Sequence, residues 1–286
     1  MDIQRKIRKV FKSRPTIEGA GVHLKRAFGY SQVPLFDPFL MLDDFRSDIP
    51  EHYTAGFPWH PHRGIETVTY VLHGSVRHGD SIGNSGVIQG GDVQWMTAGS
   101  GIIHQEMPEQ ANGNLLWGLQ LWVNLPASHK MMPPRYRDVS KAQIPEVTLE
   151  NGVTIKIVCG MVVGVQGPAQ DIIADPEYLD VTVPAGTAFE YRVKDGHTVF
   201  AYVLAGQGYF DQQKTQLIQP EQLVLFDKSG DTLATLATDD AVRFLLISGK
   251  PIGEPVAWYG PIVMNTQAEL QQAFEEYQNG TFIKHP

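Results

Sequence analysis

The stretch FPWHPHRGIETVTYVLHG, residues 57–74, places two histidines at alternate positions just before an apolar run that ends in glycine. β-Branched and aromatic residues dominate that run, a composition typical of a β-strand. In an extended chain alternate side chains point to the same face. His60 and His62 are therefore expected to face one way and Pro61 the other. The segment predicts a strand that directs two imidazoles into one space.

Similar short apolar runs fill the chain from residue 17 to about residue 250, separated by Gly, Pro, Asn and Asp. Examples are SGVIQGGDVQWMTAG, LLWGLQLWVNLP and HTVFAYVLAGQGYF. Their close spacing favours antiparallel sandwiches or barrels and gives no sign of strand–helix–strand units. We therefore predict an all-β protein.

One helix is predicted near residues 266–279, in NTQAELQQAFEEYQNG. Thr266 is a suitable N-cap, with Glu269 three residues later, and Gly280 is a suitable stop. Leu270, Phe274 and Tyr277 form an apolar stripe between them. We expect this C-terminal helix to lie against the face of a sheet.

The organisation of the chain indicates two domains. YVLHG at residues 70–74 and YVLAGQG at residues 202–208 are similar glycine-terminated strands, which suggests duplication of one β-barrel unit. The Pro-rich segment at residues 129–146 reads as a linker between the copies. We expect a metal-binding N-terminal barrel at 1–133 and a second barrel at 134–286 that ends in the helix.

Composition narrows the class of protein. The 286 residues contain no apolar run of the roughly 20 residues that span a bilayer, and no secretory signal, so we expect a cytoplasmic protein (or a nuclear one in a eukaryote) without a membrane partner. The single cysteine, Cys159, excludes internal disulfides. Residues 1–30 hold eight Lys or Arg against two acidic residues, but the rest is acidic, which argues against direct nucleic-acid binding. The alternation in IRKVFKS predicts a solvated first strand.

A second same-facing pair follows at His104 and Glu106, at the end of GDVQWMTAGSGIIHQEM. If its strand lies beside that of His60 and His62, the four side chains offer three nitrogens and one carboxylate oxygen. This set suits a first-row divalent metal and leaves positions open for ligands. The alternative is that these histidines are ordinary barrel residues bonded to neighbours. Four inward ionisable groups without a cation would be costly to bury, which favours a metal.

Neighbouring residues receive weaker predictions. Glu66 shares the parity of His60 and His62 if the strand runs unbroken through Gly64, whereas Arg63 has the opposite parity and is expected to be a supporting or surface residue. The C-terminal half has no His-x-His pair, and His197 is expected to be structural. Large apolar groups surround the proposed ligands: Phe57, Trp59, Trp95, Met96, Met107, Trp117 and Trp122. Most are expected to be core and only some to face the cavity, where they suggest a pocket mouth for a flat oxygenated aromatic ligand.

Several segments resemble a known family. Gly56, the His-x-His pair, Glu66 and Gly74 resemble the first cupin motif, and Gly91, Gly99 and His104 the second. The segments FDPFLMLDDF, WHPHRG, GDVQWMTAGSGIIHQEMP, GLQLWVNLP and GPIVMNTQAEL are similar to those of pirins, in the same order, from about residue 18 to about residue 280. Thr97, where cupins usually have proline, is itself pirin-like. The resemblance implies two tandem cupin (jelly-roll) β-barrels.

The resemblance also implies a function. His60, His62, His104 and Glu106 would bind Fe(II), although other first-row divalent metals also fit, and Glu66 would hydrogen-bond beside the site without binding the metal. The implied activity is that of a quercetin 2,3-dioxygenase, which opens the heterocycle of a flavonol with O2; Glu106 would also accept the substrate proton. An alternative is an iron-dependent, redox-sensing interaction protein that modulates a transcription regulator or another protein partner.

Overall fold

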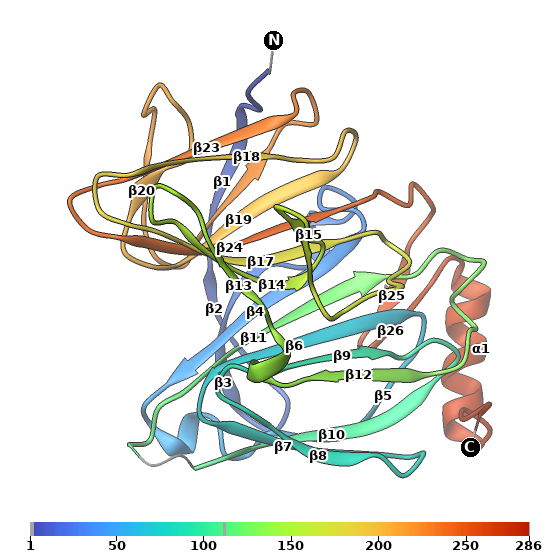
Figure 1. Ribbon diagram of the computed structural model, residues 1–286. Coiled ribbons are helices and arrows are strands. Elements are labelled where there is room, and N and C mark those ends of the chain that lie inside the picture. The colour runs from blue at the N-terminus through green and yellow to red at the C-terminus, as the bar shows by residue number, and fades with distance from the viewer. Residues whose placement is uncertain (1–2, 111–112, 286) are drawn as a thin grey trace. The chain divides into compact units, whose positions relative to one another are not determined.

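The computed structural model describes residues 3–110 and 113–285, and strands dominate these ranges (Figure 1). One α-helix lies near the C-terminus of the described chain, so the predicted all-β class with a C-terminal helix is confirmed. The chain divides into two compact units, each built from separate parts of the sequence. Residues 14–141 and 252–286 form what we call the histidine unit, and residues 1–13 and 142–251 form the second unit.

The histidine unit contains two larger antiparallel sheets and a hairpin. In spatial order the seven-stranded sheet comprises β12 (Arg135–Val139), β9 (Val93–Thr97), β6 (Ile65–His73), β11 (Leu116–Asn124), β4 (Phe39–Ser47), β3 (Val22–Phe28) and β2 (Arg14–Glu18). The four-stranded sheet comprises β5 (Phe57–His62), β10 (Ile102–Glu109), β7 (Ser75–Asp80) and β8 (Ser85–Gln89). The hairpin is β25 (Ala257–Tyr259) with β26 (Ile262–Met264), and two 3₁₀ turns are η1 (Tyr30–Gln32) and η2 (Pro50–His52).

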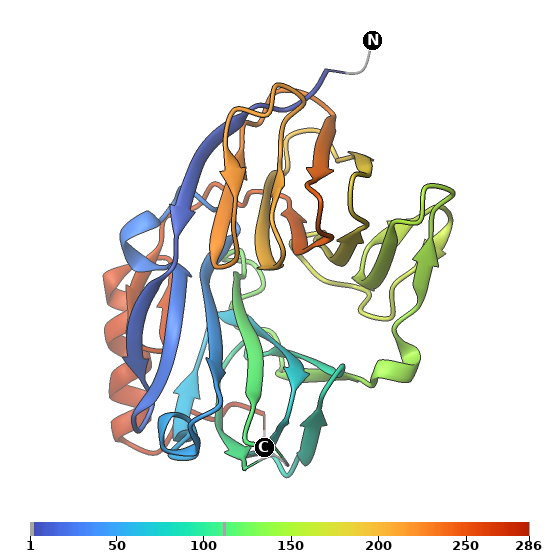
Figure 2. The same ribbon diagram turned by 90° about the vertical axis from the view of Figure 1, so that its left-hand side faces the viewer.

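The second unit repeats this plan of a seven-stranded sheet, a four-stranded sheet and a hairpin. Its larger sheet comprises β1 (Ile7–Lys12), β22 (Gln222–Phe226), β19 (Thr198–Ala205), β24 (Val242–Gly249), β17 (Glu177–Val183), β14 (Thr154–Cys159) and β13 (Glu146–Thr148), the last two forming the antiparallel edge visible in Figure 2. The smaller comprises β18 (Ala188–Arg192), β23 (Thr232–Ala237), β20 (Gly208–Tyr209) and β21 (Leu217–Ile218). The hairpin is β15 (Met161–Val162) with β16 (Val165–Gln166), and η3 spans Lys141–Gln143. The repeated plan fits the predicted pair of jelly-roll domains.

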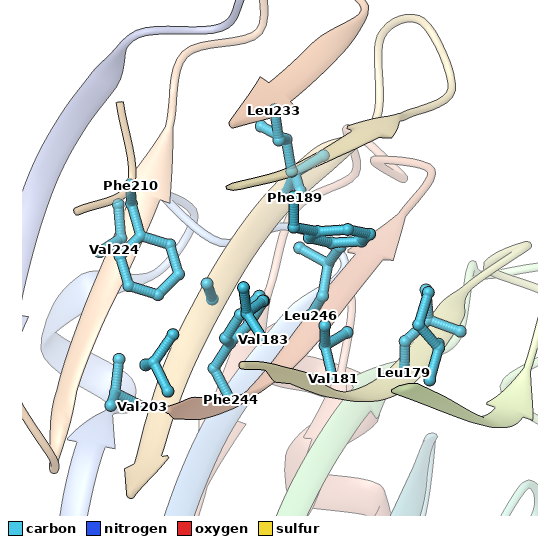
Figure 3. Close-up of a cluster of buried hydrophobic side chains, with 14 of the residues drawn as sticks. Leu179, Val181, Val183, Phe189, Val203, Phe210, Val224, Leu233, Phe244 and Leu246 are labelled. Atoms are coloured by element: carbon cyan, nitrogen blue, oxygen red, sulfur yellow. The ribbon is translucent and has the colours of Figure 1, made fainter. Parts of the chain in front are cut away.

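Apolar side chains fill the space between the two sheets of the second unit (Figure 3). Phe189 and Leu233 come from the four-stranded sheet and meet Val181, Phe244 and Leu246 from the seven-stranded sheet. These side chains are each at most 4% exposed. Removing this much apolar surface from water stabilises the unit.

The units differ from the contiguous ranges 1–133 and 134–286 expected from sequence. Strand β1, which confirms the predicted strand in IRKVFKS, pairs with β22 of the second unit. The final residues, 252–286, belong to the histidine unit. The linker assigned to residues 129–146 was wrong in part, because β12 lies inside it and pairs with β9 from Arg135 to Val139.

Helix α1 (Gln267–Gln278) begins as predicted. The Thr266 side chain accepts a hydrogen bond from the backbone N–H of Glu269, and the Glu269 carboxylate accepts one from the backbone N–H of Thr266. Leu270 and Ala273 are buried on the inner side of the helix. They belong to one apolar cluster with residues of the β25–β26 hairpin, beside which the helix lies (Figures 1 and 2). None of the helices in the described ranges is long and apolar enough to span a membrane.

Candidate metal centre

Strands β5 and β10 pair in antiparallel register, and this places His60 directly opposite His104. The Nε2 atom of His60 lies 3.1 Å from Nε2 of His62 and 3.0 Å from Nε2 of His104. Ligating atoms of all three imidazoles lie within 4.8 Å of one another, and they form the one such group of His, Cys, Asp or Glu found in the described ranges. The predicted convergence of the three histidines is therefore present.

The backbone fixes which nitrogens face the centre of this group. Nδ1 of His60 lies 2.8 Å from the carbonyl oxygen of Pro58, and Nδ1 of His62 lies 3.0 Å from the carbonyl oxygen of Pro261. A carbonyl oxygen only accepts hydrogen bonds, so each Nδ1 carries the proton and donates it. In the neutral ring Nε2 then has a lone pair and no proton. Two such lone pairs directed at each other repel unless a cation lies between them.

The spacing of the nitrogens also fits a metal. Two metal–nitrogen bonds of about 2.1 Å that meet at a right angle place their nitrogens about 3.0 Å apart, and the tetrahedral angle places them about 3.4 Å apart. The two distances, 3.0 and 3.1 Å, are short enough for His60 to share one ion with His62 and with His104. An ion held by these residues would have positions left for other ligands.

Burial keeps the imidazoles in the form that binds metals. His62 and His104 are 2% and 1% exposed. Burial lowers the pKa of both imidazoles well below the usual value, and the charge that the neighbouring imidazoles carry when protonated lowers it further. Both rings are therefore neutral at pH 7, and only the neutral imidazole offers a lone pair to a metal.

Glu106 lies on the same strand as His104 but outside the group of three. A β-bulge follows His104, so that Glu106 pairs with Phe57. Its buried carboxylate accepts hydrogen bonds from the Thr69 hydroxyl at 2.9 Å and from the Gln120 amide at 3.0 and 3.2 Å. Neither donor is charged. Its role as a ligand remains a prediction.

The condition on which Glu66 would share the face of His60 and His62 is not met, because the strand is interrupted at Gly64. There φ is +77°, a conformation that favours glycine, and a Cβ would lie 1.9 Å from the carbonyl oxygen of Val263. Strands β5 and β6 consequently belong to different sheets. Glu66 accepts hydrogen bonds from Thr97 at 2.6 Å and Trp95 at 3.2 Å. The Glu66 side chain thus makes hydrogen bonds and is not part of the histidine group.

Arg63 is a supporting residue and not a surface one, being 2% exposed. It donates to the carbonyl oxygens of Ser100 at 2.6 Å and Phe282 at 2.8 Å, and its guanidinium lies 2.8 Å from the Glu276 carboxylate. These contacts hold the C-terminal segment against the metal centre. The same segment supplies Pro261, whose carbonyl orients His62.

A row of polar residues crosses the seven-stranded sheet beside the centre. Consecutive cross-strand partners from β3 to β12 are Arg26, Asp43, Gln120, Thr69, Gln94 and Asp138. Hydrogen bonds join Arg26 to Asp43, Gln120 to Thr69 and Gln94 to Asp138. Two residues of this row, Thr69 and Gln120, donate hydrogen bonds to the Glu106 carboxylate. In this unit, therefore, polar groups occupy positions between the sheets that the second unit fills with apolar ones.

A pocket of about 820 Å³ opens onto His60 and His62. Five aromatic residues line it: Tyr30, Phe57, Trp122, Trp258 and Tyr259. Its polar wall comprises Glu18, Arg26, Asp43 and Gln120. The Arg26 guanidinium forms ion pairs with Asp43 at 2.7 Å and Glu18 at 2.9 Å, so this wall carries one net negative charge. The volume lies in the range of small-molecule sites.

As expected, only some of the apolar groups near the proposed ligands face the pocket, namely Phe57 and Trp122. Trp95 and Met96 are buried in the core, Trp59 is 52% exposed, and Trp117 donates to Asp44. Met107 and these four do not line the pocket. Sequence reasoning missed Tyr30, Trp258, Tyr259 and Gln120. The sequence did contain one signal for Gln120. It lies two residues from Trp122 in the same strand, so the two side chains are on the same face of the sheet.

Comparisons with known proteins agree with this geometry. Residues 21–123 match the model of the family described as Pirin, and residues 178–283 match the model of the pirin C-terminal cupin domain. A pirin-like protein of Caulobacter vibrioides is 46% identical over 97% of this chain and 99% of its own length. Pirin-like protein 2 of Arabidopsis thaliana is 43% identical over 94% of this chain and 86% of its own length.

A solved structure shares the whole fold. The crystal structure of quercetin 2,3-dioxygenase from Acinetobacter baumannii superposes with a TM-score of 0.90 and 32% sequence identity, over 98% of this chain and 99% of that one. The two cupin domains, the identities over nearly the full chain and the histidine group have one consistent interpretation. This chain belongs to the pirin family.

Proposed function

We propose that this protein is a metal-dependent dioxygenase that opens the heterocycle of a flavonol such as quercetin with O2. The observation that carries the proposal is the placement of His60 and His62, which face each other with unprotonated Nε2 atoms and also line an aromatic pocket. A metal held there would meet a ligand in the pocket directly. The quercetin 2,3-dioxygenase of Acinetobacter baumannii, with the same fold, supports the choice of reaction.

The proposed ligand set is His60, His62, His104 and Glu106, with Fe(II) as the favoured ion. When bound, such an ion supplies a Lewis acid and a site for oxygen chemistry. Inclusion of Glu106 rests on its environment: within residues 3–110 and 113–285 its carboxylate is hydrogen-bonded by neutral donors only. A buried carboxylate without a cation is unfavourable, and a metal would provide that cation.

The pocket residues would bind and orient the substrate. Trp122 and Trp258, with ring centroids 5.7 Å apart, and Tyr30, whose ring lies 5.5 Å from that of Trp258, present apolar faces to a flat ring system. The net negative polar wall disfavours an anionic substituent at that end of the pocket. A neutral polyphenol fits both properties, and the same aromatic wall would exclude water from the reacting end.

Glu106 is also the proposed proton acceptor. The flavonol hydroxyl must lose its proton as its oxygen binds, and a carboxylate beside the histidines is a suitable base. Thr69 donates its single hydroxyl proton to Glu106, and Gln120 donates an amide proton. These donors would keep the carboxylate in place while it gains and releases the proton.

Incubation of the iron-loaded protein with quercetin tests the proposal, with O2 uptake and carbon monoxide release measured together. We expect equimolar O2 consumption and carbon monoxide formation by the wild type, and loss of both together with bound iron in His60→Ala. His73→Ala is the matched control, because His73 is exposed and its Nδ1 donates to the Leu115 carbonyl away from the centre. Iron-loaded wild type that consumes no flavonol across a panel of substrates would overturn the assignment.

A further inference from the structure

The Gln120 amide is held in one orientation by its surroundings. Its nitrogen lies 3.0 and 3.2 Å from the two Glu106 oxygens and 3.3 Å from the Thr69 hydroxyl oxygen. The reversed amide would direct its own oxygen at a carboxylate, which only accepts hydrogen bonds. The Thr69 hydroxyl already donates its proton to Glu106 and is left as an acceptor for Gln120. All three bonds therefore require that the Gln120 N–H group face Glu106.

The Gln120 side chain is also part of the pocket wall. Gln120 is half-buried and lines the pocket, and its Oε1 makes no hydrogen bond to any residue of the described ranges. Its cross-strand neighbour Asp43 cannot donate, since both carboxylate oxygens accept from Arg26. The pocket wall thus presents an oriented acceptor on the same side chain that contacts Glu106.

We propose that Gln120 determines specificity by accepting, through Oε1, a hydrogen bond from a second hydroxyl of the ligand, one that does not bind the metal. This inference rests on the proposed function, because it supposes a polyphenolic ligand in this pocket. A ligand without that hydroxyl would cover the oxygen and leave it without a donor, and such a loss weakens binding more than an ordinary contact does. Gln120 would in this way select among flavonols by their hydroxylation pattern.

Calorimetric binding without O2 tests the inference, using the iron-loaded protein with quercetin and with flavonols that each lack one hydroxyl other than the 3-hydroxyl. For the wild type we expect one analogue to bind about tenfold more weakly than quercetin. In Gln120→Met, which has similar length and no acceptor, that difference should shrink to about twofold or less. The four affinities, with and without the ligand hydroxyl in the wild type and in Gln120→Met, form a double-mutant cycle. This cycle isolates the interaction free energy between the hydroxyl and the Gln120 side chain.

One further variant separates recognition from structure. Thr69→Val removes a hydrogen bond to Glu106 but lies outside the pocket, so it should retain the tenfold difference. The inference is overturned if Gln120→Met discriminates like the wild type, whether or not quercetin is turned over. If quercetin does not bind the wild type at all, the inference and the proposed substrate both fail.

Discussion

His60 and His104 are directly paired on adjacent antiparallel strands, and their Nε2 atoms lie 3.0 Å apart. Side chains of a directly opposed pair lie on the same face of a sheet, so the register of β5 and β10 is enough to bring the rings together. The second ring of β5, His62, joins them through the two-residue repeat of the strand. The centre is thus a property of strand register before any metal binds.

Metal removal is expected to destabilise the protein. A metal at 100 times its dissociation constant stabilises the folded state by about 2.7 kcal/mol, because the unfolded chain lacks the assembled site. Thermal unfolding followed by circular dichroism should show a lower midpoint after chelation and recovery when Fe(II) is restored without O2. His104→Ala should show no recovery, whereas His73→Ala should recover like the wild type. Equal midpoints with and without metal in the wild type would contradict the assignment.

The metal-free protein is expected to lose stability as the pH falls below about 6.5. Burial lowers the pKa of His62 and His104 in the folded state, whereas the unfolded chain has ordinary imidazoles. The unfolded state then binds more protons below pH 6.5, and each histidine reduces the free energy of unfolding by up to about 1.4 kcal/mol per pH unit. Urea unfolding of wild type and His62→Ala between pH 5 and 8 measures this slope. A slope that is the same in both proteins would rule out the contribution of His62.

Local features of the sequence were enough to predict the all-β class, the helix and the common face of His60 and His62, whereas the convergence with His104 depended on the assumption that two strands lie side by side. The two-residue spacing of His60 and His62 fixes their common face wherever the strand lies. At the start of the helix, the three-residue spacing of Thr266 and Glu269 is that of the capping box, which the two residues form. Parity does not apply to Glu66, because Gly64 adopts positive φ and breaks the strand, whereas its expected role as a hydrogen-bonding residue agrees with its bonds to Trp95 and Thr97. The presence of glycine between the two strands was the available signal.

Long-range features of the site left no local signal in the sequence. Pro261 orients His62 from 199 positions away in the sequence, and Trp258 lines the pocket. Both lie in residues 252–286, which the expected boundary after residue 133 places in the C-terminal domain, whereas the structure places them in the histidine unit. The predicted apolar stripe of α1 was correct for Leu270 but not for Tyr277, which is 38% exposed. The stripe also did not identify the β25–β26 hairpin, rather than the face of a larger sheet, as the element that the helix contacts.

Arg63 is expected to contribute strongly to folding. It is 2% exposed and bonds to Ser100, Phe282 and Glu276, whereas Glu276 is 16% exposed and retains Lys284 at 2.9 Å. Arg63→Met should lower the free energy of unfolding by about 3 kcal/mol, the low end for a broken buried pair. The exposed pair of Arg77 with Glu109 provides the control, and Arg77→Met should cost less than about 1 kcal/mol. Similar losses in urea unfolding of the two variants would refute a structural role for Arg63.

Lys130 is expected to make stability rise with pH above neutrality. Lys130 is 1% exposed, and its ammonium group donates to the carbonyl oxygens of Gly64 and Val263 and to the side-chain oxygen of Asn124. Burial lowers the pKa of Lys130 to about 7, against 10.5 in the unfolded chain. Between pH 7 and 10 the unfolded state therefore binds more protons, and the wild type should gain up to about 1.4 kcal/mol per pH unit relative to Lys130→Met. Urea unfolding of both proteins at pH 7, 8 and 9 measures the difference, and a constant difference would mean that the three oxygens keep the lysine charged throughout.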